Sequence, residues 1–534
     1  MRASILIVGG GPVGSTMALD FAWRGIDVIV AEQNPAGQMP GVKCNHVAAR
    51  TMEIFRRLGV SRIVRDTGLP ADHANDVAFR TSAIGEDFAR IQIPCRRDRY
   101  TRKDGSDGSW PTPEPPHRIN QIYLDPLLAA EARSRPNVRY LNRTRVTGFT
   151  QSETGVIAEA VDTGGQFSIE CDYLLGCDGP SSMVRHEIGV RLTGDAMIGR
   201  TQSTYIRASG LRAMMQAEPA WSTQVMNPRR SANMFAVDGR ETWLIHNYLR
   251  PDETEFAMVD SDACIGAILG DGVDYEVISQ ENWIGRRMLA DRFRDRRVFI
   301  CGDAAHLWVP FAGYGMNAGI ADAMNLSWML AGVLKGWADP EILAAHEAER
   351  WPITEQVSRY AMDTAAQLMR ARGEVPADIE ASPAARAALG QQMLAMHTPQ
   401  FCCGGLNFGS YYDRSPIIAY DGVAPPPYTM DTFTPSTIPG CRTPHIWLDD
   451  GRSLYDAMGP DYTLLRFDPS VPTETLIRAS AVRGVPVSVV DIEPQPPYGE
   501  KLVLSRPDQH VAWRGDALPS DVMGLVDRIR GGID

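Results

Sequence analysis

Glycines and an acidic residue follow an apolar run near the start of this 534-residue chain. The run Ile5–Val8 leads into a glycine-rich turn, and Glu32 follows 18 residues after the last glycine of that turn. The turn residues are Gly9, Gly11, Pro12, Val13 and Gly14. In a strand–turn–helix unit such glycines permit a tight turn, a close approach of a pyrophosphate to the backbone, and close helix–sheet packing. The carboxylate of Glu32 can bind ribose hydroxyls and disfavours a 2′-phosphate, so the stretch predicts a site for FAD or NAD.

A second stretch, Cys301–Trp328, also places glycine and an acidic residue between the end of an apolar strand and a helix. The apolar residues Val298–Cys301 meet Gly302 and Asp303, and a loop rich in proline, glycine and aromatic residues then enters a helix. The acid can take the hydroxyls of a phosphorylated ribityl chain, and a helix start offers free N–H groups to an electron-rich group. An ordinary strand–loop–helix of a parallel sheet is the alternative interpretation.

A third stretch, Tyr173–Arg185, again ends an apolar strand in an acid and a glycine, Asp178 and Gly179. Two further residues are candidates by their charge: Lys43 and Arg50, around the start of an amphipathic helix near Ala48. Lys43 and Arg50 are suited to contact phosphates or a flavin, although a solvated surface position is the default for either.

These three stretches require a parallel sheet, and the rest of the sequence predicts the elements that surround this sheet. Short alternating segments between residues 202 and 283 have the period of half-buried strands and indicate an inserted antiparallel sheet with one face open to a ligand. His246 and Tyr248 lie between residues 202 and 283. The same segment contains several aromatic residues, which are expected either to line a pocket or to pack in the core. After a Gly-, Pro- and Tyr-rich segment, strands and helices alternate in a small C-terminal α/β domain.

The predicted fold class is therefore α/β, with a Rossmann-like dinucleotide-binding domain, an inserted substrate domain and a C-terminal domain. The predicted boundaries are 1–75, 117–200 and 284–400 for the first domain, 76–116 and 201–283 for the second, 401–433 for a linker and 434–534 for the third.

Composition restricts the function class. A net charge of −12 argues against nucleic acid or an anionic membrane surface as the main partner. The nine cysteines show neither CxxC nor metal-ligand spacing, so we expect no metal site and a reducing, cytoplasmic location. The chain enters a strand at once, and no apolar run approaches the length of a membrane span, so we expect neither a signal peptide nor a membrane anchor.

Together, GGGPVG, CDGPSSMVR and CGDAAHLWVPFAGYGMNAGIADAMNL resemble the group A flavoprotein monooxygenases, aromatic hydroxylases that keep FAD bound. The resemblance spans the chain, because PGCRTPHIWLDDGRSLYD and RPDQHVAWRGD are similar to the thioredoxin-like extension of the larger phenol and polyketide hydroxylases.

The resemblance implies roles for the motif residues. The turn glycines and Glu32 would bind the ADP half of FAD, Gln121 would lie near the cofactor, and Asp303 would hold the ribityl chain. Asp178 and Gly179 match a fingerprint that is implicated in both FAD and NAD(P)H binding. Pro310, Gly313, Gly315, Met316 and Asn317 would lie beside the isoalloxazine ring, with Lys43 where relatives place an arginine next to the flavin. Gly302, beside Asp303, and Arg50 are the remaining cofactor-binding candidates.

The implied reaction starts with hydride transfer from NADPH or NADH to FAD, after which O₂ forms a flavin C4a-hydroperoxide that hydroxylates a phenolic or polycyclic aromatic substrate. With only one G-x-G-x-x-G turn in the chain, the nicotinamide nucleotide is expected to dock transiently. The base that deprotonates the substrate is not identified. The residues considered for the catalytic region are Pro310, Tyr314, His246 and Tyr248, although a hydrogen-bonded structural role competes for His246 and Tyr248.

The chain departs from the family pattern at three places. Ala312, Tyr314 and Ala318 interrupt the usual glycine-rich loop, and Lys43 stands where relatives commonly carry arginine. The C-terminal domain has a single cysteine, Cys441, so we expect it to act in packing or in contacts of a homodimer and not in thiol redox chemistry.

Two alternatives stay open: a Baeyer–Villiger or epoxidising enzyme of the same fold, and a flavin-binding protein without turnover. A flavin halogenase is disfavoured, because the chain has no W-x-W-x-I-P stretch.

Overall fold

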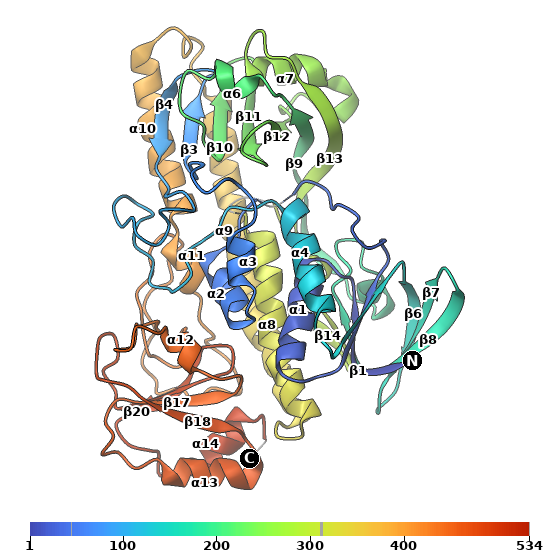
Figure 1. The fold of residues 1–534 in the computed structure, drawn as a ribbon, viewed down its shortest axis with the longest axis vertical. Helices are drawn as coiled ribbons and strands as arrows, with labels where there is room; N and C mark the ends of the chain where they lie inside the picture. The colour runs from blue at the N-terminus through green and yellow to red at the C-terminus, as the bar shows by residue number, and fades with distance from the viewer. Residues whose placement is uncertain (44, 310–312, 533–534) are drawn as a thin grey trace.

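The computed structural model describes residues 1–43, 45–309 and 313–532, with the backbone alone for 196–198. Three sheets follow one another along the long axis of the molecule (Figure 1), with the C-terminal sheet at one end and the large antiparallel sheet at the other. None of the helices in these ranges is long and apolar enough to cross a membrane.

The first sheet positions the dinucleotide turn. Its strands run in the order β14-β15-β8-β1-β2-β5, and β6 and β7 extend it as an antiparallel ribbon beside β8. The central part of this sheet is parallel, and it comprises the pairs β15–β8, β8–β1, β1–β2 and β2–β5. The strands are β1 (Arg2–Val8), β2 (Val28–Glu32), β5 (Val138–Asn142), β6 (Arg145–Gln151), β7 (Val156–Asp162), β8 (Gly165–Gly176), β14 (Arg294–Asp295) and β15 (Val298–Ile300).

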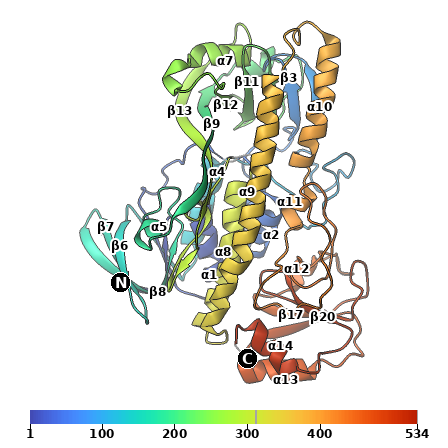
Figure 2. The same ribbon diagram turned by 180° about the vertical axis from the view of Figure 1, so that it is seen from behind.

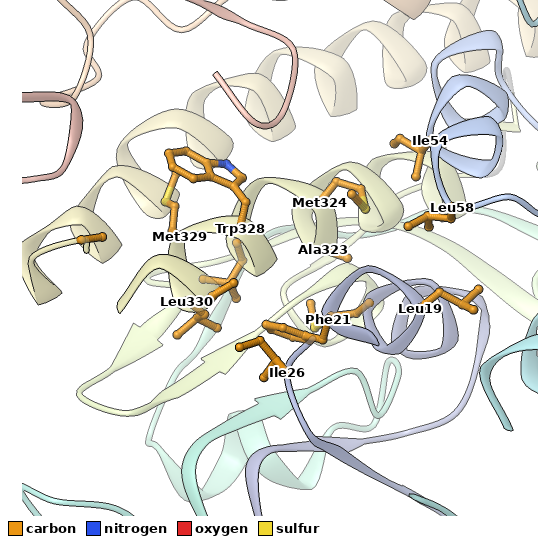
Figure 3. Close-up of a cluster of buried hydrophobic side chains, with 14 of the residues drawn as sticks. Leu19, Phe21, Ile26, Ile54, Leu58, Ala323, Met324, Trp328, Met329 and Leu330 are labelled. Carbon is orange, nitrogen blue, oxygen red and sulfur yellow. The ribbon is translucent and has the colours of Figure 1, made fainter. Parts of the chain in front are cut away.

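Alternate residues of β1 face two different cores, as the two-residue period of a strand requires. Ile5 and Ile7 pack on the helical side, whereas Leu6 and Val8 pack toward the ribbon and helix α5. Figure 3 shows the helical side, where Phe21 of α1 lies near Ala323 and Leu330 of α8. The helices around this sheet are α1 (Pro12–Trp23), α2 (Ala49–Arg57), α3 (Ser61–Arg65), α4 (Gln121–Arg133), α5 (Met183–Glu187) and α8 (Tyr314–Leu334).

The second sheet is largely antiparallel and has the order β16-β13-β9-β12-β11-β10-β3-β4. Its strands are β3 (Val77–Arg80), β4 (Asp87–Ile91), β9 (Leu192–Arg207), β10 (Ser222–Met226), β11 (Ser231–Ala236), β12 (Thr242–Tyr248), β13 (Glu276–Ala290) and β16 (His306–Leu307). The long strands β9 and β13 reach from this sheet toward the first one (Figure 1). Two short helices, α6 (Leu211–Met214) and α7 (Ser261–Leu269), accompany it.

Helix α10 (Pro383–Phe401) belongs to this second unit, although the sequence placed residues up to 400 in the dinucleotide-binding domain. Its residues Leu389 and Met393 pack in one cluster with Phe79 and Ile91 of the second sheet. The physical reason is that the preceding helix α9 (Ala344–Gly373) carries the chain from the C-terminal end of the molecule to the second sheet (Figure 2).

The C-terminal unit has a four-stranded sheet of order β18-β17-β19-β20, in which β17 and β18 are parallel and the other pairs are antiparallel. Its elements are α12 (Leu454–Ala457), β17 (Tyr462–Arg466), α13 (Glu474–Arg483), β18 (Val487–Asp491), β19 (Leu502–Ser505), β20 (Val511–Gly515) and α14 (Val522–Ile529). Its core is continuous with that of α8, because Tyr462 packs edge-on against Trp328 at a ring distance of 5.9 Å.

Residues 401–433, expected to be a linker, contain the short helix α11 (Gly404–Phe408) and are largely packed. Tyr412 and Ile418 are buried, and the Ser415 hydroxyl donates to the Glu349 carboxylate of α9 at 2.5 Å. The segment therefore fastens the C-terminal unit to the rest of the chain instead of spacing it away.

Candidate functional site

A cavity of about 950 Å³ lies where the carboxyl ends of β1, β2, β8 and β15 meet the second sheet. The predicted site residues that line it are Gly9, Gly11, Pro12, Val13, Glu32, Lys43, Gln121, Asp178, Gly179, His246, Tyr248, Asp303, Gly313, Gly315 and Met316. Ligands of open α/β sheets bind at this edge of the strands, because helix N-termini and loops converge there.

The glycine-rich turn has the geometry that its sequence predicts. Gly9 has φ +102°, and a Cβ atom there would lie 2.3 Å from the Cys177 carbonyl oxygen, so only glycine fits. Gly11 lines the cavity, and a Cβ atom added to it would meet nothing within 4 Å. Because Gly11 caps α1 without a side-chain hydrogen bond, the first amides of that helix remain available to an anionic ligand.

Glu32 also organises the turn. Its carboxylate accepts hydrogen bonds from the Gly10 amide at 2.7 Å and from the Asn34 amide at 2.8 Å. The side chain lines the cavity beside these contacts, so the same carboxylate shapes the loop and faces the ligand space.

Two further carboxylates face the cavity close to the cofactor end. Asp303 is open to the cavity but enclosed by protein, and this burial raises its pKa above the ordinary value, against the attraction of His306 and Lys43. Asp125 follows Gln121 by one helical turn on α4, and burial raises the pKa of Asp125 to about 7. The positive charge of Lys43 lowers the pKa of both carboxylates, against the effect of burial, so this charge lies near them.

The start of α8 borders the cavity through Gly313, Gly315 and Met316. Asn317 was expected beside the flavin, but its side chain forms hydrogen bonds with the protein backbone. It accepts from the Ala48 amide at 2.9 Å and donates to the His46 carbonyl at 3.1 Å, so it ties the loop before α2 to α8. Gly302 lies behind the lining, where its amide donates to Asp322 at 3.3 Å.

Asp178 stabilises its own turn while facing the cavity. Its carboxylate accepts from the Ser182 hydroxyl at 2.5 Å and from the Val184 amide at 3.1 Å, at the start of α5. Gly179 adjoins it with φ +78°, in the left-handed region.

The far part of the cavity is bordered by an aromatic wall, defined here as Trp221, Phe235, His246 and Trp283. Successive ring centroids are 5.3, 5.5 and 6.1 Å apart, so the four rings form a continuous row. Trp221 immediately precedes β10, and the other three come from β11, β12 and β13, which explains why sequence spacing could not assemble them. Such a row gives an aromatic ligand apolar ring faces and edges to pack against.

His246 is held in this row by a short hydrogen-bond chain. Trp283 Nε1 donates to Ser203 Oγ at 2.7 Å, and Ser203 Oγ lies 2.6 Å from His246 Nδ1. Burial and the nearby Arg372 lower the pKa of His246 to about 4, so the imidazole is neutral near pH 7. Since Ser203 Oγ accepts from the indole, its own hydrogen can go to Nδ1, and the neutral ring then carries its proton on Nε2.

Tyr248 lies under a guanidinium instead of facing a base. The Arg372 carbon Cζ is 3.9 Å from the Tyr248 ring centroid, and Asn233 donates to the Tyr248 hydroxyl at 3.2 Å. Burial raises the pKa of Tyr248, so its phenol stays protonated near neutral pH.

Five predicted site residues of the described ranges do not line the cavity, namely Gly14, Arg50, Gly302, Tyr314 and Asn317. Arg50 points to the C-terminal unit, where it donates to Gln509 at 2.5 Å and to the Asp508 carbonyl at 2.6 Å. Tyr314 is buried, and its hydroxyl donates to the Leu406 carbonyl at 2.5 Å, so it neither narrows the cavity nor meets a ligand there. Gly14 packs behind the turn, and Pro310 lies outside the described residues.

The sequence reasoning missed Arg118, His46 and Asp125, all of which line the cavity. Asp125 had a readable signal, since it stands four residues after Gln121 and so on the same helix face. Arg118 and His46 had none, because their contact joins positions 72 residues apart.

The described residues fit FAD. Free helix amides and a glycine without steric neighbours suit a pyrophosphate, and Glu32 is an acceptor for ribose hydroxyls. Asp303 offers a carboxylate for which the described residues show no hydrogen-bond donor, so it is available to the hydroxyls of a ribityl chain. The amides at the start of α8 lie where an electron-rich ring edge would gain from their partial charge.

Comparisons with known proteins agree with this geometry. Residues 2–361 match the family model described as FAD binding domain, and residues 436–531 match the one described as aromatic-ring hydroxylase, C-terminal. The FAD-dependent monooxygenase apdD of Emericella nidulans is 29% identical over 97% of this chain and 88% of its own length. The phenol 2-monooxygenase of a Pseudomonas species is 28% identical over 98% of this chain and 91% of its own.

Solved structures show the same arrangement of all three units. RebC, a rebeccamycin biosynthetic enzyme solved with reduced flavin, superposes with a TM-score of 0.90 at 33% identity, covering 100% of this chain and 99% of that one. A ternary complex of aklavinone-11 hydroxylase with FAD and aklavinone has a TM-score of 0.80 at 25% identity, covering 99% and 98%. The predicted α/β fold class with its three units is confirmed.

Proposed function

The chain belongs to the FAD-dependent aromatic-ring monooxygenases, and from that premise we propose that it uses NAD(P)H and O₂ to hydroxylate a phenolic or polycyclic aromatic substrate held against the aromatic wall. The relatives named for phenol and for the polycyclic aklavinone support this substrate range. Cytoplasmic location and a homodimer stay predictions from the sequence.

Bound FAD would supply the redox chemistry, that is, hydride acceptance and activation of O₂. The chain supplies binding and electrostatics. The turn at Gly9–Gly14 and Glu32 would hold the ADP half, and Asp303 the ribityl hydroxyls. The ammonium of Lys43 and the first amides of α8 favour negative charge at the ring edge, which lowers the cost of reduction.

At the substrate end, the neutral imidazole of His246 would donate from Nε2 to a substrate oxygen. This role follows from its lowered pKa and from the Ser203 contact at Nδ1. His246 is then a hydrogen-bond donor and not the base, and the protonated Tyr248 is not a base either. The aromatic wall orients the ring and excludes water from the reacting carbon.

One observation carries the proposal: the same cavity is lined by the dinucleotide turn and by the aromatic wall, so a bound flavin and an aromatic ring would share one space. Fold alone does not fix the reaction, but this juxtaposition is what ring hydroxylation requires.

The test uses purified protein, which should be yellow and should release non-covalent FAD on heating. NAD(P)H oxidation is measured with and without a panel of phenols, naphthols and polycyclic quinones under ¹⁸O₂. Hydroxylation predicts substrate-stimulated NAD(P)H use and a product that carries one ¹⁸O atom in a phenol. A lactone product would point to Baeyer–Villiger chemistry, and oxidation that no panel member stimulates, with only hydrogen peroxide formed, would contradict the proposal.

A further inference from the structure

Arg118 is a buried cation on the wall of the cavity. Its residue exposure is 4%, and its guanidinium carbon lies 4.0 Å from the ring centroid of Trp221, the first ring of the aromatic wall. One nitrogen, Nη1, contacts Nδ1 of His46. Within the described residues, the remaining N–H groups of this guanidinium have no hydrogen-bond acceptor, and no carboxylate lies within ion-pair distance of it.

The neighbouring charges do not compensate Arg118. His46 is uncharged, because burial and Arg118 itself hold its pKa well below the ordinary value. Asp107, the carboxylate that acts most strongly on the pKa of Arg118, is already paired with Arg99. Burial lowers the pKa of Arg118 to about 10, which still leaves the group charged near pH 7.

An uncompensated buried charge is costly, and proteins pair such charges almost without exception. Most buried arginines of this chain follow that rule, as Arg506 and Arg65 do with carboxylates in contact. Arg118 differs in that its free donors border the ligand space. A guanidinium with two parallel N–H groups matches a carboxylate better than it matches a single oxygen.

Resting on the proposed function, we propose that Arg118 is the anion-binding residue of the substrate site and that the substrate is an aromatic compound bearing a carboxylate. The carboxylate lies against Arg118 beside Trp221, and the ring system extends along Phe235 toward His246 and Trp283. Within the aromatic wall, Phe235 lies between Trp221, at the anionic end, and the His246 imidazole, so the site suits a fused or extended ring system with an oxygen substituent at the far end.

The experiment uses the FAD-bound protein and a matched ligand pair, 6-hydroxy-2-naphthoate and its carboxamide, which differ in charge but hardly in shape and carry the hydroxyl at the end far from the carboxylate. Each is titrated at neutral pH, and the dissociation constant is read from the change in flavin absorption. Wild-type protein should bind the carboxylate about tenfold or more tighter than the carboxamide, the ratio expected for charge-assisted hydrogen bonds. In Arg118→Met this ratio should fall to about one because affinity for the carboxylate is lost, and Arg118→Lys should recover part of it.

The matched control is Arg62→Met, which removes the same charge from a side chain that is 94% exposed on α3. It should leave the ligand ratio unchanged. Equal ratios in wild type and Arg118→Met, no binding of either ligand to wild type, or an equal loss of both ligands in Arg118→Met would each overturn the proposal. A loss of FAD from Arg118→Met would also overturn it, because Arg118 would then belong to the cofactor site.

This outcome is separable from that of the proposed function. If the enzyme oxidises NAD(P)H with neutral phenols and their turnover does not depend on Arg118, monooxygenase function stands and the carboxylate assignment fails. If no aromatic compound stimulates NAD(P)H use but the Arg118-dependent ligand preference is present, the anion site stands and the proposed function fails.

Discussion

Arg506 of the C-terminal unit and Glu349 of helix α9 form a two-point ion pair with no solvent exposure of either side chain. The nitrogen–oxygen distances are 2.5 and 2.8 Å, and Arg506 also pairs with Asp508 at 2.8 Å. This pair fixes the C-terminal sheet to the helix that leads to the substrate sheet.

Arg506→Met should destabilise the protein strongly, because it leaves two buried carboxylates without their cation. The free energy of unfolding should fall by about 3–5 kcal/mol. Glu349→Gln, which keeps the pair with Asp508, should cost less. Urea unfolding followed by tryptophan fluorescence measures both. The control is Arg452→Met, whose pair with Asp450 is 60% and 51% exposed and should contribute at most about 1 kcal/mol. Similar losses in Arg506→Met and Arg452→Met would contradict this assignment.

Glu32→Ala should weaken FAD binding. The substitution removes the acceptor of the Gly10 and Asn34 amides as well as the expected contact to ribose. Loss of charge-assisted hydrogen bonds at about 1.5–3 kcal/mol each corresponds to roughly a tenfold to hundredfold rise in the dissociation constant, measured by the fluorescence of released FAD. Arg50→Met is the control, since its guanidinium faces the C-terminal unit. It should lower thermal stability and leave FAD affinity unchanged; reduced FAD affinity would restore Arg50 to the cofactor site.

Lys43→Met should slow reduction of the flavin. The ammonium lines the cavity, and its removal takes away positive charge that stabilises the reduced ring. A loss of about 1.4 kcal/mol would slow a charge-limited reduction roughly tenfold in anaerobic stopped-flow measurements with NAD(P)H. Lys43→Arg should preserve the rate. An unchanged rate in Lys43→Met would place this side chain in solvent, away from the ring.

Asp125 should make the stability of the FAD-free protein depend on pH. Its pKa is about 7 when folded and about 3.9 when unfolded, so between these values the folded chain holds a proton that the unfolded chain has lost. Stability from this group is therefore fully present below about pH 4 and is lost as the pH rises through 7. Asp125→Asn should remove that decline in urea midpoints, whereas Asp449→Asn, at an exposed position, should not. Parallel curves for wild type and Asp125→Asn would refute the assignment.

The cofactor end of the site could be predicted from the sequence because its signals are local. A turn such as Gly9–Gly14 is encoded within a few residues, and the acids at Asp178 and Asp303 follow their strands directly. Parallel strands then bring these ends to one edge without further information.

The substrate end could not be predicted in the same way. The aromatic wall joins neighbouring strands whose register is set by cross-strand pairing, as in Phe235 opposite Leu244, and not by spacing along the chain. The direction of Arg50 could not be predicted, because its partner Gln509 lies 459 residues away. The direction of Tyr314 could not be predicted either, because a side chain at a helix start turns according to what packs beside it, here α11.

Helix α9 connects the two ends of the molecule mechanically (Figure 2). Near its start, Arg350 is bound to Asp322 of α8 at 2.8 Å, one residue after the Glu349 contact to the C-terminal unit. Near its other end, Arg372 rests on Tyr248 at the cavity. From Arg350 to Arg372 the helix rises by about 33 Å, at 1.5 Å per residue. A rigid tilt of about 3° about the Arg350 end would therefore move Arg372, and its contact with the Tyr248 ring, by about 2 Å.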